Sequence, residues 1–122
     1  MSDSTVKKHK VTIACDSSGD FTVDTCHISG MFIGLFYKPD GTAPLPSTAD
    51  LTITGKDTGF PYYAEGDIGT VNRVDIVETE VVDETGTAVT GVTDKMPVDE
   101  ALTVTIASGG ASDAGELWIY TK

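Results

Sequence analysis

The chain has 122 residues, a net charge of −11 and 39% hydrophobic residues. A domain of this length can bury a core without disulfides or metal ions, and its negative charge repels phosphate backbones, which excludes nucleic acid as a direct partner. No apolar run approaches the ~18 residues of a membrane span, so we expect no membrane association.

The residue types favour strands over helices. Thr (18 residues) and Val (12) are abundant, and 13 glycines and 5 prolines punctuate the apolar segments. β-Branched residues suit pleated strands and are weak helix formers, whereas Gly and Pro suit tight turns. The composition therefore predicts an all-β fold.

The first ten residues, MSDSTVKKHK, are polar and basic. We predict a flexible arm over residues 1–10 and a single β-sandwich domain over 11–122. No apolar stretch follows the charges, so no secretory signal peptide is expected. Lys7, Lys8 and Lys10 precede a region with 18 acidic and 5 basic residues, which makes them candidates to contact an acidic partner surface.

The next two apolar segments predict a β-hairpin. Val11–Cys15 and Phe21–Ile28 alternate apolar and polar residues on either side of the turn-forming DSSGD. In this register Cys15 and Cys26 lie too far apart for a disulfide, so two reduced, buried thiols are expected.

The same hairpin register places His9 opposite His27, beside Cys26. Two imidazoles and a thiolate could hold zinc, but neighbouring residues of a strand point to opposite faces and no paired ligand spacing is present. The DSSGD and DETG loops also lack the spacing of a calcium-binding loop. We therefore predict no metal site.

The most apolar segment is Gly30–Pro39, which lacks alternation from Met31 to Phe36. This pattern is typical of a strand covered on both faces, either in the centre of a sheet or against a partner chain. Met31 and Phe32 are therefore interface candidates. The Pro-rich segment Lys38–Asp50 is predicted to be a loop.

The segment Ala49–Gly55 alternates apolar Leu51 and Ile53 against Thr52 and Thr54, which predicts a half-buried strand with the apolar pair inward, followed by a KDTG turn. Asp57-Thr58-Gly59 matches the tripeptide of aspartic proteases, but that chemistry needs a buried pair of carboxylates. Here Lys56 precedes the Asp and bulky Phe60 follows the Gly, so a solvated turn is predicted. No nucleophile or phosphate-binding motif is present, and we expect no enzyme activity, no catalytic residues and no cofactor.

The C-terminal half predicts further strands. Phe60–Thr70 is irregular and aromatic, Val71–Val82 forms one or two strands, and the MPV at Met96–Val98 lies in a connection. Ala101–Ser108 and the terminal ELWIYTK should pair as an antiparallel hairpin. Their inward residues are predicted to be Leu102, Val104, Ile106, Leu117 and Ile119, with Trp118 and Tyr120 on the other face. In total, about 7–8 strands predict a single antiparallel β-sandwich or small barrel.

Three segments, Leu51–Gly59, Met96–Gly110 and Gly115–Tyr120, resemble small β-rich proteins encoded in the structural modules of tailed bacteriophages. In those proteins a strand ending in Thr-Ile-Thr-Gly precedes an x-Asp-Thr-Gly turn. A Met/Ile-Pro-Val-x-Glu element then leads to Val-x-Ile-Ala-x-Gly-Gly and a terminal Gly-x-Leu/Ile-x-Ile-Tyr strand. The segment 71–89 diverges from this pattern.

The resemblance implies a virion component without catalytic residues, made in the host cytoplasm. A capsid decoration (cement) protein on the outer head surface, bound to the major capsid protein, is one such component. A neck or tail accessory that binds other virion proteins is another, and we expect a homo-oligomer in either case. An alternative from the residues alone is a carbohydrate-binding or host-adhesion module, in which Tyr62, Tyr63, Trp118 and Tyr120 stack on sugar rings.

Overall fold

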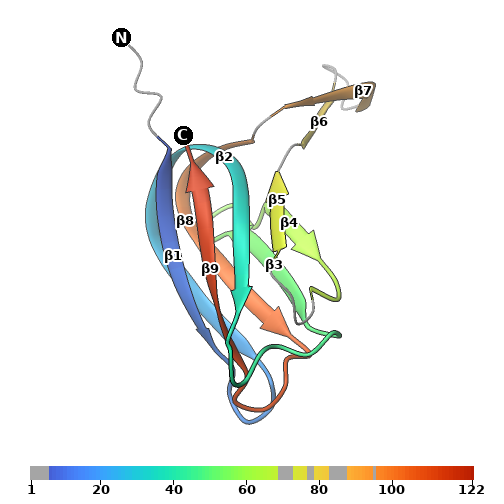
Figure 1. The fold of residues 1–122 in the computed structure, drawn as a ribbon. Helices are drawn as coiled ribbons and strands as arrows, with labels where there is room; N and C mark the ends of the chain where they lie inside the picture. The colour runs from blue at the N-terminus through green and yellow to red at the C-terminus, as the bar shows by residue number, and fades with distance from the viewer. Residues whose placement is uncertain (1–5, 69–72, 77–78, 83–87, 95) are drawn as a thin grey trace.

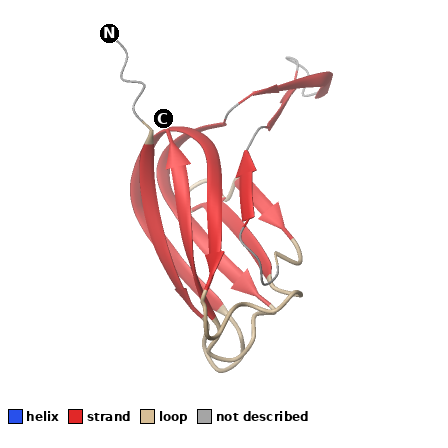
Figure 2. Cartoon of the chain, viewed as in Figure 1, coloured by secondary structure: helices blue, strands red, loops and turns tan. Residues whose placement is uncertain are grey.

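The computed structural model describes residues 6–68, 73–76, 79–82, 88–94 and 96–122, and these contain strands and no helix (Figure 2). The all-β prediction is confirmed. The strands are β1 (Lys7–Ala14), β2 (Phe21–Pro39), β3 (Asp50–Gly55), β4 (Pro61–Glu65), β5 (Arg73–Ile76), β6 (Thr79–Val82), β7 (Ala88–Asp94), β8 (Met96–Ala107) and β9 (Ala114–Thr121).

Seven of these strands form one antiparallel sheet in the order β1-β9-β2-β8-β3-β4, with β5 paired to β2. Strand β2 is 19 residues long, and its two parts pair with different strands. Its first part, from Phe21 to Phe32, pairs with β8, and its second part, from Phe32 to Pro39, pairs with β9 and partly with β5. Figure 1 shows β2 turning over beside the C-terminus, so that the sheet folds back on itself.

Two local features of β2 allow this fold-back. Gly30 has a φ of 146°, and a Cβ there would lie 2.9 Å from the carbonyl oxygen of Lys122. A register shift between Phe32 and Gly34 then changes which residues point inward. Phe32 is buried before the shift, and Leu35 and Tyr37 are buried after it. This bulge explains why the segment lacks alternation although, as predicted, β2 lies in the centre of the sheet.

The hydrophobic core lies between the two parts of the folded sheet. The residues predicted to point inward on β3, β8 and β9 are all buried, and each contributes about 1.5–3 kcal/mol through removal from water. The fully or nearly fully buried aliphatic residues of the core include Ile13, Ile28, Leu35, Leu45, Leu51, Ile53, Leu102, Val104, Ile106, Leu117 and Ile119.

Both predicted hairpins are wrong in their pairing. The turn Asp16–Asp20 forms, with the Asp16 N–H donating to the Asp20 carbonyl at 3.0 Å. However, β1 pairs with β9 and the first part of β2 pairs with β8. Strands β8 and β9 likewise lie on either side of β2. The reason is that another strand lies between the two strands of each predicted hairpin: β9 lies between β1 and β2, and β2 lies between β8 and β9.

Several predicted boundaries also need correction. Strand β1 begins at Lys7, so Lys7–Lys10 belong to the sheet and only residues 1–5 of the predicted arm lie outside the described residues. Lysines are common on an edge strand such as β1, because they discourage further edge-to-edge pairing. The aromatic segment at Pro61–Glu65 forms β4, and Met96–Val98 belongs to β8.

The cysteines are free, as predicted, but they differ in exposure: Cys15 is buried and Cys26 is exposed. The register of β2 against β8 shifts between Asp24 and His27. At this bulge the Thr25 hydroxyl accepts the Leu102 N–H at 3.0 Å. The bulge interrupts the alternation on which the prediction of a buried Cys26 depended.

Strands β6 and β7 form a separate two-stranded antiparallel sheet, with Thr79 opposite Asp94 and Glu80 opposite Thr93. The region predicted as one or two strands therefore contains two, β5 and β6; residues 71–72 and 77–78 of it lie outside the described residues. Figure 1 shows the β6–β7 hairpin extending away from the seven-stranded sheet.

Candidate binding face

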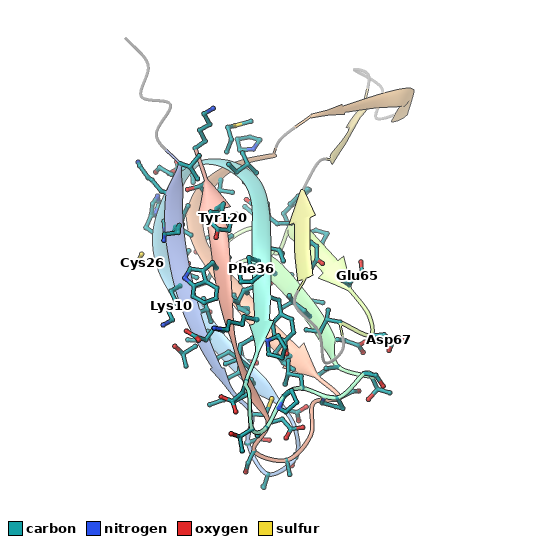
Figure 3. The ribbon with its side chains drawn as sticks, in the orientation of Figure 1. Lys10, Cys26, Phe36, Glu65, Asp67 and Tyr120 are labelled. Carbon is teal, nitrogen blue, oxygen red and sulfur yellow. The ribbon has the colours of Figure 1, made fainter. Side chains whose placement is uncertain are left out.

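Alternation along three neighbouring strands gathers aromatic and charged side chains on the outer face of the sheet. Trp118 on β9 lies between Lys10 on β1 and Phe36 on β2, as its direct cross-strand partners. One row away, Tyr120 lies opposite Lys8. Figure 3 shows Lys10, Phe36 and Tyr120 over the same side of these strands. The aromatic face is defined as Lys10, Phe36, Glu116, Trp118 and Tyr120.

The side chains of the aromatic face support one another. The ring centroids of Phe36 and Trp118 are 5.6 Å apart at an interplanar angle of 33°. The Lys10 Nζ lies 5.6 Å from the Trp118 ring centroid and 2.6 Å from the Glu116 Oε2. Because the Lys10 side chain is 53% exposed, this ion pair adds little to stability, but it fixes charges of both signs beside the rings.

The three aromatic rings of this face are half-buried. Their edges pack on neighbouring side chains of the same sheet, and their remaining surface meets solvent. Rings held in this way lose little conformational entropy on binding and supply a large apolar contact area. The face can therefore bind a flat, partly apolar surface with polar groups at its rim.

The structure brings only some of the predicted site residues together. Lys10, Trp118 and Tyr120 share the aromatic face, and Lys8 adjoins it. Lys7 lies near His9, whose pKa is lowered by burial and by the charge of Lys7. Lys7 directly precedes Lys8 on β1 and therefore points to the other face of the strand, so it is not part of the aromatic face.

The other two candidates, Met31 and Phe32, lie elsewhere. Met31 is half-buried at the bend of β2, where its N–H donates to the Lys122 carbonyl at 3.0 Å. Phe32 is fully buried, with its ring centroid 6.2 Å from that of Tyr62. Sequence reasoning missed Phe36 as a site residue, because its outward direction depends on the bulge in β2.

Of the aromatic residues considered for sugar binding, only Trp118 and Tyr120 lie on this face. Tyr62 is buried on β4, where its ring packs edge-on against Phe60 with centroids 4.9 Å apart. Tyr63 is half-buried on the same strand and packs against the core. The four residues therefore do not form one binding platform.

The predicted KDTG turn is confirmed, and it surrounds a buried carboxylate. Glu100 on β8 is 3% exposed. Its Oε1 accepts the backbone N–H groups of Asp57 at 2.8 Å and Thr58 at 3.0 Å. Its Oε2 accepts the Thr58 hydroxyl at 2.7 Å and the Tyr62 hydroxyl at 2.9 Å. A Cβ at Gly55 would collide with this carboxylate, so the glycine makes room for it.

These four donors stabilise the ionised form of Glu100. The side-chain and backbone hydrogen bonds from Thr58, followed by that from Asp57, lower the pKa of Glu100 to about 2. A carboxylate with its acceptor positions filled by the protein is a structural anchor. Sequence reasoning missed it because Glu100 and Asp57 are far apart in the chain, although a Glu in an apolar strand is a usable signal.

The residues weighed as zinc ligands are not paired as the predicted hairpin register implied. His9 lies opposite Ile119, and His27 bonds the Asp99 Oδ1 at 2.7 Å. Within the described part of the chain, no group of three or more His, Cys, Asp or Glu residues is arranged to hold a metal ion. The described residues also include no helix that could cross a membrane.

Neither a known family model nor a curated protein matches this sequence.

Proposed function

We propose that this protein is a non-enzymatic virion structural protein of a tailed bacteriophage, and that it is a capsid decoration protein. In this proposal the aromatic face binds the major capsid protein on the outer surface of the head. Each bound copy adds buried area across the boundary between capsomers, which raises the resistance of the head to internal pressure.

The aromatic face is the observation that carries this proposal. Trp and Tyr are enriched among the residues that contribute most to protein–protein binding, typically with a polar rim around them. Trp118, Phe36 and Tyr120 form such a centre, and Lys10 and Glu116 lie at its edge. The aromatic face is built on three hydrogen-bonded strands, which hold its side chains in fixed positions relative to one another.

The sequence resemblance supports the same proposal independently. Leu51–Gly59 corresponds to most of β3 and its turn, and Gly115–Tyr120 corresponds to most of β9. A neck or tail accessory protein would share these segments and would use the same face against another virion protein. A homo-oligomer is part of the proposal for either position.

A binding experiment with Trp118→Ala tests the role of the face. Purified wild-type protein and the variant are added to particles that lack this protein, and the bound fraction is measured against concentration. We expect at least about tenfold weaker binding for the variant, since a central aromatic is removed. Equal binding by a folded Trp118→Ala variant would contradict the proposal.

The matched control is Tyr63→Ala. It also removes a half-buried aromatic ring, but from β4 in the other part of the folded sheet. We expect this variant to bind like the wild type once its folding is verified by thermal unfolding. A comparable loss in both variants would show that binding does not depend on the aromatic face.

A carbohydrate-binding or adhesion module is the second candidate, because three rings lie on one face beside a lysine and a carboxylate. Trp118 is the only tryptophan of the chain, so its fluorescence reports directly on this surface. Titration with mono- and oligosaccharides that shifts this fluorescence saturably would favour the sugar-binding module. An unchanged spectrum across the set would favour the virion protein.

A further inference from the structure

The strands that carry the aromatic face also carry three lysines on the same side of the sheet. Lys8 lies two residues before Lys10 on β1, and Lys38 lies two residues after Phe36 on β2. Because side chains two residues apart in a strand point the same way, both lysines flank the aromatic rings. With Lys10 they give three positive charges, and Glu116 gives one negative charge. This side of the three strands is therefore basic, whereas the whole chain has a net charge of −11.

Two of these lysines have no counter-charge among the described residues. Lys10 already pairs with the Glu116 carboxylate, at 2.6 Å between the Lys10 Nζ and the Glu116 Oε2. Lys8 and Lys38 are exposed, and neither forms an ion pair with a described residue. Their positive charges are therefore available to a partner that covers the rings.

The register places Lys8 and Lys38 at opposite ends of the aromatic face. Lys8 lies opposite Tyr120 on one side of β9, and Lys38 lies opposite Glu116 on the other side. Four residues along β9 and two strand spacings across it separate the two lysine backbones by roughly 16 Å. The rings of Trp118 and Phe36 are bonded to strands between these two ends, so an apolar centre lies between two positive charges.

We propose that the aromatic face binds a protein surface with an apolar centre and two carboxylates at its ends, spaced to reach Lys8 and Lys38. The apolar centre packs on Trp118 and Phe36, and each carboxylate neutralises one lysine. The rest of the chain is acidic and repels such a surface, so the charges also set the orientation in which the partner docks. This inference rests on the proposed function only in treating the aromatic face as a protein-binding surface.

Titration of the Trp118 fluorescence with short peptides tests the charge requirement. The peptide ELTLTE carries two glutamates that lie roughly 16 Å apart in an extended chain, with leucines between them. QLTLTQ and KLTLTK have the same centre with neutral and positive ends. None of these peptides contains an aromatic residue, so the single tryptophan of the chain reports the binding.

At an ionic strength of about 0.1 M, where charges are screened beyond about 10 Å, we expect a saturable shift with ELTLTE. Binding of QLTLTQ should be at least about fivefold weaker, and KLTLTK should be weaker still, because its charges face the lysines. Raising the ionic strength to about 1 M should remove most of the difference between ELTLTE and QLTLTQ.

Charge reversal at single lysines locates the contact. We expect Lys8→Glu and Lys38→Glu each to weaken the binding of ELTLTE at least about fivefold, because attraction becomes repulsion. Lys7→Glu is the matched control. It makes the same change at the neighbouring exposed residue of β1, which points to the other face of the strand, and it should bind like the wild type. Thermal unfolding verifies that each variant is folded.

Several results would overturn this inference. One is the absence of a saturable shift with ELTLTE, or equal affinity for ELTLTE and QLTLTQ. Another is an equal loss of binding in Lys7→Glu and Lys8→Glu, which would indicate a general effect of net charge. Self-association of the wild type that Lys8→Glu abolishes, measured by sedimentation velocity, would make a second copy the partner instead. Failure of the wild type to bind particles would contradict the capsid role alone, because the peptide titration uses no particles.

Discussion

At the scale of single residues, the Asp-Thr-Gly tripeptide acts through its backbone. The N–H groups of Asp57 and Thr58 donate to Glu100, and the Asp57 side chain is exposed. The turn therefore serves to enclose a buried carboxylate of a neighbouring strand. In a protease of the aspartic type, the Asp carboxylate itself would be the buried and functional group.

Replacing Glu100 with Gln tests whether the turn is held by the buried Glu100 carboxylate. The amide NH₂ of Gln cannot accept hydrogen bonds, so two of the donors around it lose their acceptor while remaining partly buried. We expect thermal unfolding of Glu100→Gln at a midpoint several degrees lower than that of the wild type. Asp57→Asn removes an equal charge from the turn that donates to Glu100, and its midpoint should stay near the wild-type value.

The low pKa of Glu100 also predicts how stability depends on pH. Folding lowers this pKa from 4.5 to about 2, so the folded state favours the ionised carboxylate. This contribution to the free energy of unfolding is complete above pH 4.5 and is lost as the pH falls towards 2. Denaturant titrations across this range should therefore show a shallower loss in Glu100→Gln than in the wild type.

Some acid sensitivity should remain in the Glu100→Gln variant. Hydrogen bonds lower the pKa of four exposed carboxyls, so they also favour the folded state above their usual pKa. These residues are Asp16, Asp24, Asp40 and Asp99. Identical pH profiles in the wild type and Glu100→Gln would contradict the role of Glu100.

At the scale of elements, β2 determines the topology. Its bend at Gly30 and its bulge after Phe32 let one strand pair with β8 in its first part and with β9 in its second. The core forms between these parts, and the bulge turns Phe36 outward beside Trp118. The aromatic face therefore depends on a backbone irregularity in β2.

Gly30→Ala tests the bend. An alanine at a φ of 146° is strained, and its Cβ would approach the Lys122 carbonyl oxygen to 2.9 Å. We expect the free energy of unfolding to fall by about 1–3 kcal/mol. Gly41→Ala is the control, because no atom lies within 4 Å of a Cβ there. Equal stability of Gly30→Ala and the wild type would show that the bend does not need glycine.

The sequence predicts single strands better than their pairing. Leu51 and Ile53 on β3, and Leu117 and Ile119 on β9, were placed inward correctly, because period-two alternation is a local property. The hairpin predictions failed because each assumed that consecutive strands pair. Alternation in β2 is interrupted twice, and no local pattern reveals that a strand changes partner at such a point.

The candidate site shows the same difference between what local alternation predicts and what strand pairing determines. Trp118 and Tyr120 were predicted on one outer face, and alternation in β9 is sufficient for that inference. Their position beside Lys10 and Phe36 depends on the pairing of β9 with both β1 and β2. Strand pairing across more than eighty residues of sequence is a tertiary property, so the complete face could not be derived from the sequence.

At the scale of the whole molecule, charge and shape divide the surface into regions with different roles. The chain carries a net charge of −11, which favours solubility of single copies. The lysines of β1 line one edge, the β6–β7 hairpin extends on another side, and the aromatic face lies between β1 and β2 on the outside of the sheet. In the proposed function, the aromatic face is the region that binds the capsid.

The most direct test of the virion assignment is the copy number of this chain in purified particles. Particles from cells that produce the protein are purified on a density gradient, and the chain is quantified against the major capsid protein by mass spectrometry. A capsid decoration protein predicts a copy number comparable with that of the major capsid protein. A few copies per particle would indicate the neck or tail instead, and absence from the particles would contradict the virion assignment.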